Sequence, residues 1–177
     1  MRKALLFLIL IFVSSILISC ADKEQEIDEI IKYYNEEWVP INNSIKGKLE
    51  ELTTEFIKLD AKKDKSEATE LIQTEIIPLT EEMVTELENV EPENKTIKKM
   101  NNLQIEAEKF AIKSYKHIIK YYDGEITESE LAKDKQKLDN MYEDVIEYQQ
   151  KVLKKYNMKK SDEKIGNVSK WEKSAYK

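Results

Sequence analysis

The apolar positions of the chain recur every three or four residues and predict long amphipathic helices. Ten apolar side chains follow this spacing in residues 23–61, which is the period of one face of an α-helix. No segment alternates between apolar and polar residues as a half-buried strand does. The members of this first stripe are Ile27, Ile31, Tyr34, Trp38, Ile41, Ile45, Leu49, Leu52, Phe56 and Leu59.

A proline interrupts this first predicted helix. Pro40 has no amide hydrogen to donate, and its ring clashes with the carbonyl of Glu36, four residues earlier. We therefore expect a first helix that is kinked or broken at Pro40. Pro78 predicts a second kink, in the next helix.

Start and stop signals divide the rest of the chain into three further helices, over about 65–90, 95–122 and 127–157. Asp64-Lys65-Ser66-Glu67 is a helix start, and Thr127-Glu128-Ser129-Glu130 is typical of a capping box. Short loops between long amphipathic helices predict an all-α fold, an antiparallel up-down bundle of four long helices over residues 20–158. Residues 159–177 have no sustained apolar period and are expected to be a flexible, mobile tail.

The composition agrees with long helices and few turns. The 177 residues include only three glycines and three prolines, and 36% of them are charged. A single cysteine, Cys20, leaves no partner for an intramolecular disulfide. Helix packing alone must therefore stabilise this domain.

The N-terminal segment has the layout of a secretory signal. Arg2 and Lys3 precede an apolar run from Ala4 to Leu17, and a small residue, Ser19, precedes the cysteine. The stretch Leu17-Ile18-Ser19-Cys20 resembles the lipobox of bacterial lipoproteins. The resemblance implies removal of residues 1–19 and acylation of the Cys20 thiol, so that Cys20 anchors the protein to the membrane.

Two other interpretations of this segment stay open. An uncleaved membrane helix would need about 20 apolar residues, and the run here is shorter. An ordinary signal peptide would leave Cys20 without a role. Two acyl chains on one cysteine suffice for stable anchoring, whereas a single chain would hold only marginally.

The charge is unevenly distributed along the chain. Residues 151–177 contain nine lysines against three carboxylates, a net charge of +6, whereas residues 20–150 carry −14. The acidic body argues against nucleic acid as a partner. The basic tail indicates one of two things. Either its first lysines offset the dipole of the fourth helix and the rest is merely soluble, or the tail meets an anionic membrane or wall polymer through Lys159, Lys160, Lys164, Lys170 and Lys173.

The sequence contains no pattern that predicts catalysis. A di-metal carboxylate bundle would need Glu-x-x-His pairs, but the one histidine, His117, follows Ser114 at that spacing. We expect His117 to be an ordinary surface residue. No catalytic residue, cofactor or metal ligand is predicted.

Aromatic residues gather at one predicted end of the bundle. In an up-down arrangement the start of the first helix lies beside the end of the fourth. The residues concerned are Tyr33, Tyr34, Trp38, Tyr148 and Tyr156. They indicate either core packing with hydroxyls at the edge or a membrane-proximal aromatic groove for a lipid, glycan or peptide.

These features favour a lipid-anchored binding protein of the cell envelope, on the outer face of the bacterial cytoplasmic membrane and without catalytic activity. The layout is similar to that of small helical lipoproteins of Gram-positive bacteria. One alternative is an immunity or inhibitor lipoprotein that neutralises a basic secreted toxin or wall hydrolase. The other is a ligand carrier or enzyme with a site in the bundle core, which would need several converging carboxylates or histidines there.

Overall fold

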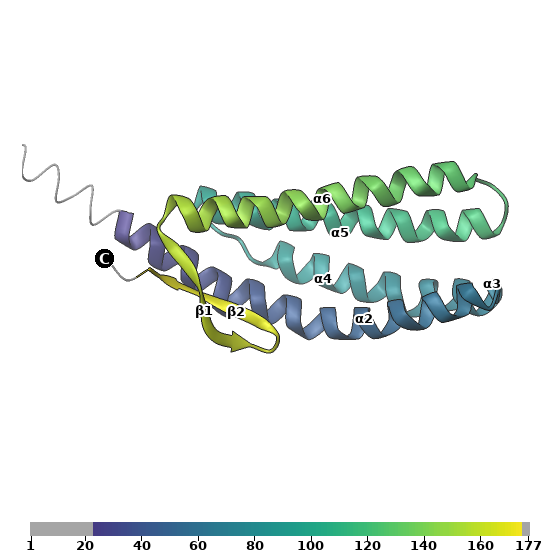
Figure 1. The fold of residues 1–177 in the computed structure, drawn as a ribbon, viewed down its shortest axis with the longest axis horizontal. Helices are drawn as coiled ribbons and strands as arrows, with labels where there is room; N and C mark the ends of the chain where they lie inside the picture. Colours follow the sequence, from purple (N-terminus) through teal and green to yellow (C-terminus); the bar gives the residue numbers. More distant parts are fainter. Residues whose placement is uncertain (1–22, 175–177) are drawn as a thin grey trace, which may run out of the picture.

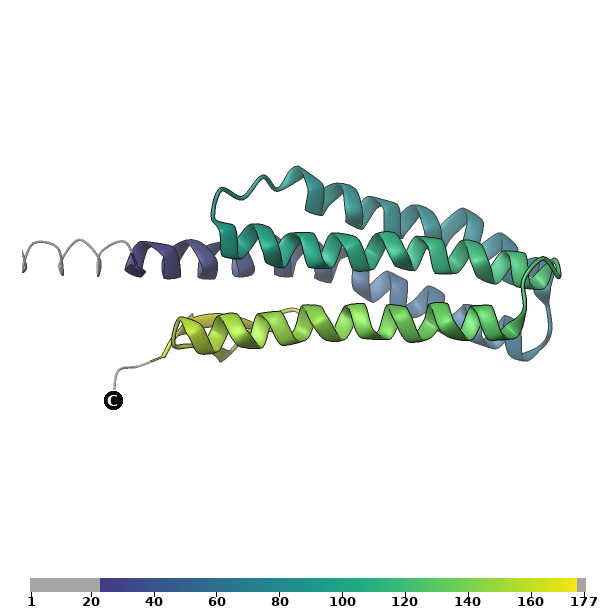
Figure 2. The same cartoon turned by 90° about the horizontal axis from the view of Figure 1, so that it is seen from above.

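The structure, a computed structural model, describes residues 23–174. Of these described residues 79% are helical, and a small two-stranded sheet follows the helices. Four long helical segments lie side by side along one axis (Figures 1 and 2). The chain is helical from residue 23 and continues through η1 (Tyr34–Trp38), α2 (Val39–Ala61), α3 (Lys65–Leu71), η2 (Ile72–Ile76), α4 (Ile77–Asn89), α5 (Lys95–Tyr122), α6 (Glu128–Lys155), β1 (Met158–Ile165) and β2 (Val168–Lys173).

The two prolines inside helices, Pro40 and Pro78, are each accommodated by a π-helical turn rather than by a break. The turn η1 ends two residues before Pro40, and the Val39 amide donates to the Tyr34 carbonyl, five residues back. The turn η2 stands at the same offset from Pro78, with the Ile77 amide donating to Ile72. In the wider π-helical turn, amides donate to carbonyls five residues back, which satisfies backbone groups beside a proline that has no amide hydrogen to donate. The helix therefore runs through Pro40, and the expected irregularity lies in the five residues before Val39.

The predicted helix starts are confirmed by their side-chain caps. Asp64 accepts a hydrogen bond from the Glu67 amide at the start of α3. The Thr127 hydroxyl accepts from the Glu130 amide, while the Glu130 carboxylate accepts from the Thr127 amide, which forms a complete capping box. Asn94 caps α5 through the amides of Thr96 and Ile97. These bonds satisfy amides that have no partner inside the helix.

The predicted mobile tail is wrong: residues 158–173 form an antiparallel β-hairpin. Its two-residue turn places Gly166 at φ +59°, the sign that a type II′ turn requires at its first central position. A side chain at residue 166 would also press on Asn43, whose amide donates to the Ile165 carbonyl. The all-α prediction therefore holds for the helical part of the chain and fails for its C-terminal end.

The hairpin packs against the first helical segment (Figure 1). The Asn35 side chain pairs with both backbone groups of Trp171, accepting from its amide at 2.8 Å and donating to its carbonyl at 2.9 Å. An amide side chain thus takes the place of a neighbouring strand at the edge of β2. Lys173 adds ion pairs with Asp28 at 2.8 Å and Glu24 at 3.3 Å.

The buried core is largest where the hairpin joins the helices. One cluster combines side chains from the first segment, α4, α5, α6 and both strands, including Ile30, Tyr34, Met100 and Trp171. A smaller cluster around Ile72, Ile76 and Ile77 lies toward the other end and is completed by half-buried side chains. The two ends of the molecule therefore differ in how fully their apolar side chains are covered.

Within residues 23–174, no helix combines the length and the apolar character needed to cross a bilayer.

Candidate functional site

The five aromatic residues singled out from the sequence come together, but they do not form a groove. Tyr33, Tyr34, Trp38 and Tyr156 are all buried, and Tyr148 is half-buried. The Tyr33 hydroxyl donates to the Asn101 side chain at 2.8 Å, inside the protein. This burial favours the core-packing interpretation, and the space of the alternative, an open aromatic groove, is filled.

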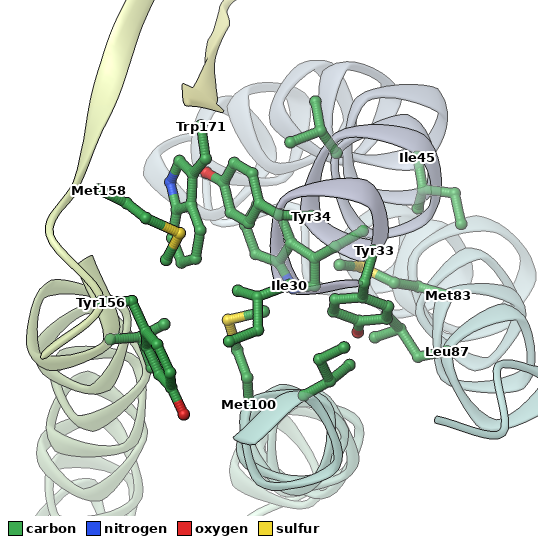
Figure 3. Packing of buried hydrophobic residues seen from close by; sticks show 14 of the residues in the cluster. Ile30, Tyr33, Tyr34, Ile45, Met83, Leu87, Met100, Tyr156, Met158 and Trp171 are labelled. Carbon is green, nitrogen blue, oxygen red and sulfur yellow. The ribbon is translucent and has the colours of Figure 1, made fainter. Parts of the chain in front are cut away.

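A side chain from the hairpin fills it. The Trp171 ring stacks on Tyr34 with centroids 3.8 Å apart (Figure 3). Tyr34 in turn stacks on Trp38, with centroids 5.0 Å apart. Met158 from β1 lies beside Trp171 in the same view. Burial raises the pKa of Tyr34 to about 12.

The tail lysines belong to an ordered surface. Lys159 pairs with Glu172 across the strands at 2.9 Å, and Lys170 pairs with Glu163 at 2.7 Å. Lys173 is held by the first helix, as described above. Lys160 and Lys164 are exposed on β1. The charges expected to meet an anionic surface thus partly neutralise local carboxylates.

Two predicted features lie outside the described residues. They are the signal segment, 1–19, and the anchor residue Cys20.

A different hollow lies where α2 and α5 end and α6 begins. These helix ends lie at the opposite end of the molecule from the hairpin (Figure 1). This distal groove has a volume of about 290 Å³. Its lining comes from α2, α5 and α6 and comprises Phe56, Asp60, Ser114, Tyr115, Ile118, Tyr121, Tyr122, Leu131, Asp134, Lys135 and Leu138. Most of the large apolar members are half-buried, although the sequence stripes placed several of them in the core.

The polar groups of the distal groove are fixed by partners. The Tyr122 hydroxyl donates to the Asp60 carboxylate at 2.6 Å. The Lys135 ammonium is held by Asp139 at 2.5 Å. The Lys65 ammonium lies 5.5 Å from the centre of the Tyr122 ring, so this rim already attracts one cation.

His117 contributes to the same region and is not an ordinary surface residue. Its Nδ1 pairs with the Asp134 carboxylate across the α5–α6 interface. The two side chains are only 26% and 17% exposed, respectively. The prediction of a solvated histidine missed this partner because Asp134 lies 17 positions further along the chain.

A buried carboxylate lies deeper between α5 and α6. Glu108 is 4% exposed, accepts from the Gln104 amide at 2.5 Å and accepts from the Tyr142 hydroxyl at 3.0 Å. Burial raises the pKa of Glu108. The two hydrogen bonds and the positive charge of Lys46 act in the opposite direction and lower it, but their effect is smaller. Burial, with Glu108 beside it, raises the pKa of Tyr142.

The sequence analysis missed Glu108 because a stripe built from apolar residues leaves out a polar side chain, although Glu108 lies three positions before buried Ala111 on the same face of its helix. Several converging carboxylates would have pointed to a carrier or enzyme, and here one buried carboxylate meets neutral partners. Among the residues that the structure describes, no cluster of three or more His, Cys, Asp or Glu side chains is arranged to hold a metal ion. The network can hold a proton in the interior and fix the register of α5 against α6.

Comparison with known proteins identifies no relative: the chain matches no protein-family model, and no curated protein or solved structure is detectably similar to it.

Proposed function

We propose that this protein is a lipid-anchored binding protein of the bacterial cell envelope, without catalytic activity. Acylated Cys20 would hold it at the outer face of the cytoplasmic membrane. The lipobox resemblance supports the anchor, and the helical residue Lys23 stands only three positions after Cys20 in the sequence.

The observation that carries the binding role is the position of the distal groove. At 1.5 Å per residue, the helix from residue 23 to Phe56 spans about 50 Å. A groove at that end would stand well clear of the lipid headgroups if the helices rise from the membrane. An open apolar groove at the free end of an anchored rod is suited to bind a partner that arrives from outside the cell.

The architecture that we infer for the helical part is the antiparallel up-down bundle of four helices. The connections at 62–64, 90–94 and 123–127 are short, which supports antiparallel neighbours. This arrangement would bring the hairpin and the anchor to one end. Exposed Lys160 and Lys164 could then contact anionic headgroups or wall polymers there.

A specific form of this function is an immunity or inhibitor role against a secreted toxin or wall hydrolase. The charge of −14 on residues 20–150 favours a basic partner. A ligand carrier or core enzyme has less support, because the buried carboxylate Glu108 does not line the distal groove.

The anchor is tested by Cys20→Ser in intact cells. We expect an unprocessed precursor and no labelling by a fatty-acid analogue, because the substitution removes the acylated thiol. Unchanged processing and labelling would refute lipid anchoring.

The distal binding role is tested by photocrosslinking in the same cells. A photoreactive amino acid at Lys135, on the groove, should give an adduct of defined mass. The same amino acid at Lys160, on the hairpin, should not give that adduct. The same adduct from both positions would show that binding is not confined to the distal end.

A further inference from the structure

The distal groove has the size of an anchor pocket for side chains. Pockets that enclose drug-sized ligands measure about 300–1,000 Å³, so 290 Å³ lies at the lower limit. A whole lipid does not fit. One or two large side chains do, and such anchors supply much of the energy of protein interfaces.

The lining selects for an apolar side chain that is accompanied by a cation. Aliphatic walls come from Ile118, Leu131 and Leu138, and aromatic walls come from Phe56 and three tyrosines. Asp60 contributes a carboxylate whose only described partner is the neutral Tyr122 hydroxyl, whereas Asp134 is paired with His117 and the one lysine in the lining, Lys135, is paired with Asp139. Aromatic rings attract cations through their faces, as Lys65 shows at the rim.

We propose that the distal groove binds a segment of a secreted polypeptide in which large apolar side chains are flanked by lysine or arginine. The apolar side chains enter between α2, α5 and α6, and a flanking cation meets the exposed carboxylate of Asp60. The acidic body of the protein steers this segment toward the groove. The inference rests on the proposed function for the place where the partner is met. The chemical character of the partner is inferred from the residues that line the groove.

The experiment measures binding of three labelled eight-residue peptides to the full-length chain in nonionic detergent, by fluorescence anisotropy against a detergent-only blank. One peptide carries Lys-Leu-Phe-Lys, the second Glu-Leu-Phe-Glu and the third Lys-Ser-Ser-Lys at its centre. We expect the first to bind about tenfold or more tightly than the other two, because only it offers both features. Equal binding of the acidic peptide, or no saturable binding of the first, would overturn the proposal.

Matched variants locate the site. Leu138→Ser, in the groove, should lower the affinity for the first peptide by about tenfold. Ile146→Ser, at an exposed apolar position on the same helix, should change that affinity by less than about twofold. Circular dichroism checks that both variants keep their helix content. Equal effects of the two variants would place the peptide outside the groove.

Two variants that each remove one negative charge test the electrostatic part of the proposal without disturbing the apolar packing. Asp60→Asn should weaken binding by about threefold or more at low salt and less at high salt, whereas Asp162→Asn on the hairpin should not. No effect of Asp60→Asn would remove the cation from the proposal. Sedimentation of the full chain addresses the other occupant: a dimer that Leu138→Ser dissociates would overturn the proposal in favour of a second copy.

The two proposals fail separately. Loss of peptide selectivity with a persistent Lys135 crosslink would refute this inference and leave the distal binding role intact. A selective peptide with no crosslink in cells would refute the distal role in the envelope and leave the chemistry of the groove intact.

Discussion

Removing the indole of Trp171 tests whether the hairpin is part of the cooperative core. The side chain is 1% exposed and stacks face to face on Tyr34 with an interplanar angle of 10°. A buried tryptophan covers about 150–250 Å², which at about 25 cal/mol per Å² gives about 4–6 kcal/mol as an upper bound. Measured losses for Trp→Ala in cores are about 3–5 kcal/mol. We expect Trp171→Ala to lower the free energy of unfolding by that amount.

Urea denaturation followed by circular dichroism at 222 nm measures this loss without relying on the tryptophan signal. The matched control is Lys164→Ala, because Lys164 is exposed on the neighbouring strand and should change stability by about 0.5 kcal/mol or less. An isolated two-stranded hairpin is at best marginally stable, so its order depends on this contact. A loss below about 1 kcal/mol for Trp171→Ala would mean that the helices fold without the hairpin.

Two further predictions concern polar groups at the α5–α6 interface. Burial raises the folded-state pKa of Glu108, so above about pH 4.5 the folded protein keeps a proton that the unfolded chain releases. Relative to Glu108→Gln, the wild type should therefore lose stability as pH rises from about 4.5 through that raised pKa. Urea unfolding at several pH values measures the stability difference between the two proteins. Glu106→Gln, at an exposed position, is the control. A stability difference for Glu108→Gln that does not change with pH would contradict a raised pKa of Glu108. His117→Ala should cost about 1–2 kcal/mol, because it leaves the largely buried Asp134 carboxylate without its partner. Exposed Lys116→Ala should cost about 0.5 kcal/mol or less in the same assay, and equal losses for the two variants would refute the role of the pair.

The helices were predictable because their signals are local. Period and caps need only a few consecutive residues, which is why the start of α3 and the capping box of α6 were identified correctly. The π-helical turns were not predicted in this form. Pro40 and Pro78 announce a disturbance, but the sequence does not say whether the helix breaks, bends or widens.

The hairpin was missed because its strands carry a weak period and many lysines. The one strong signal is Ile165-Gly166-Asn167-Val168, a two-residue turn with glycine at the position that needs positive φ. Long-range contacts order the strands, among them the pairing of Asn35 with the backbone of Trp171, 136 positions further along the chain. Periodicity within one segment cannot reveal such a contact.

The distal groove could not be predicted for a related reason. Phe56 lies on the same apolar stripe as Ile45, yet Ile45 is 2% exposed and Phe56 is half-buried. At the end near residue 23, the hairpin supplies an additional layer over the aromatic side chains. At the other end no element of residues 23–174 supplies such a layer, so the same kind of stripe is left partly open to solvent. A stripe states which face of a helix is apolar, and the neighbouring elements decide whether that face becomes core or binding surface. In this protein the C-terminal hairpin covers the apolar side chains at the end that we assign to the membrane. At the end that points away from the membrane, we propose that an incoming partner covers them.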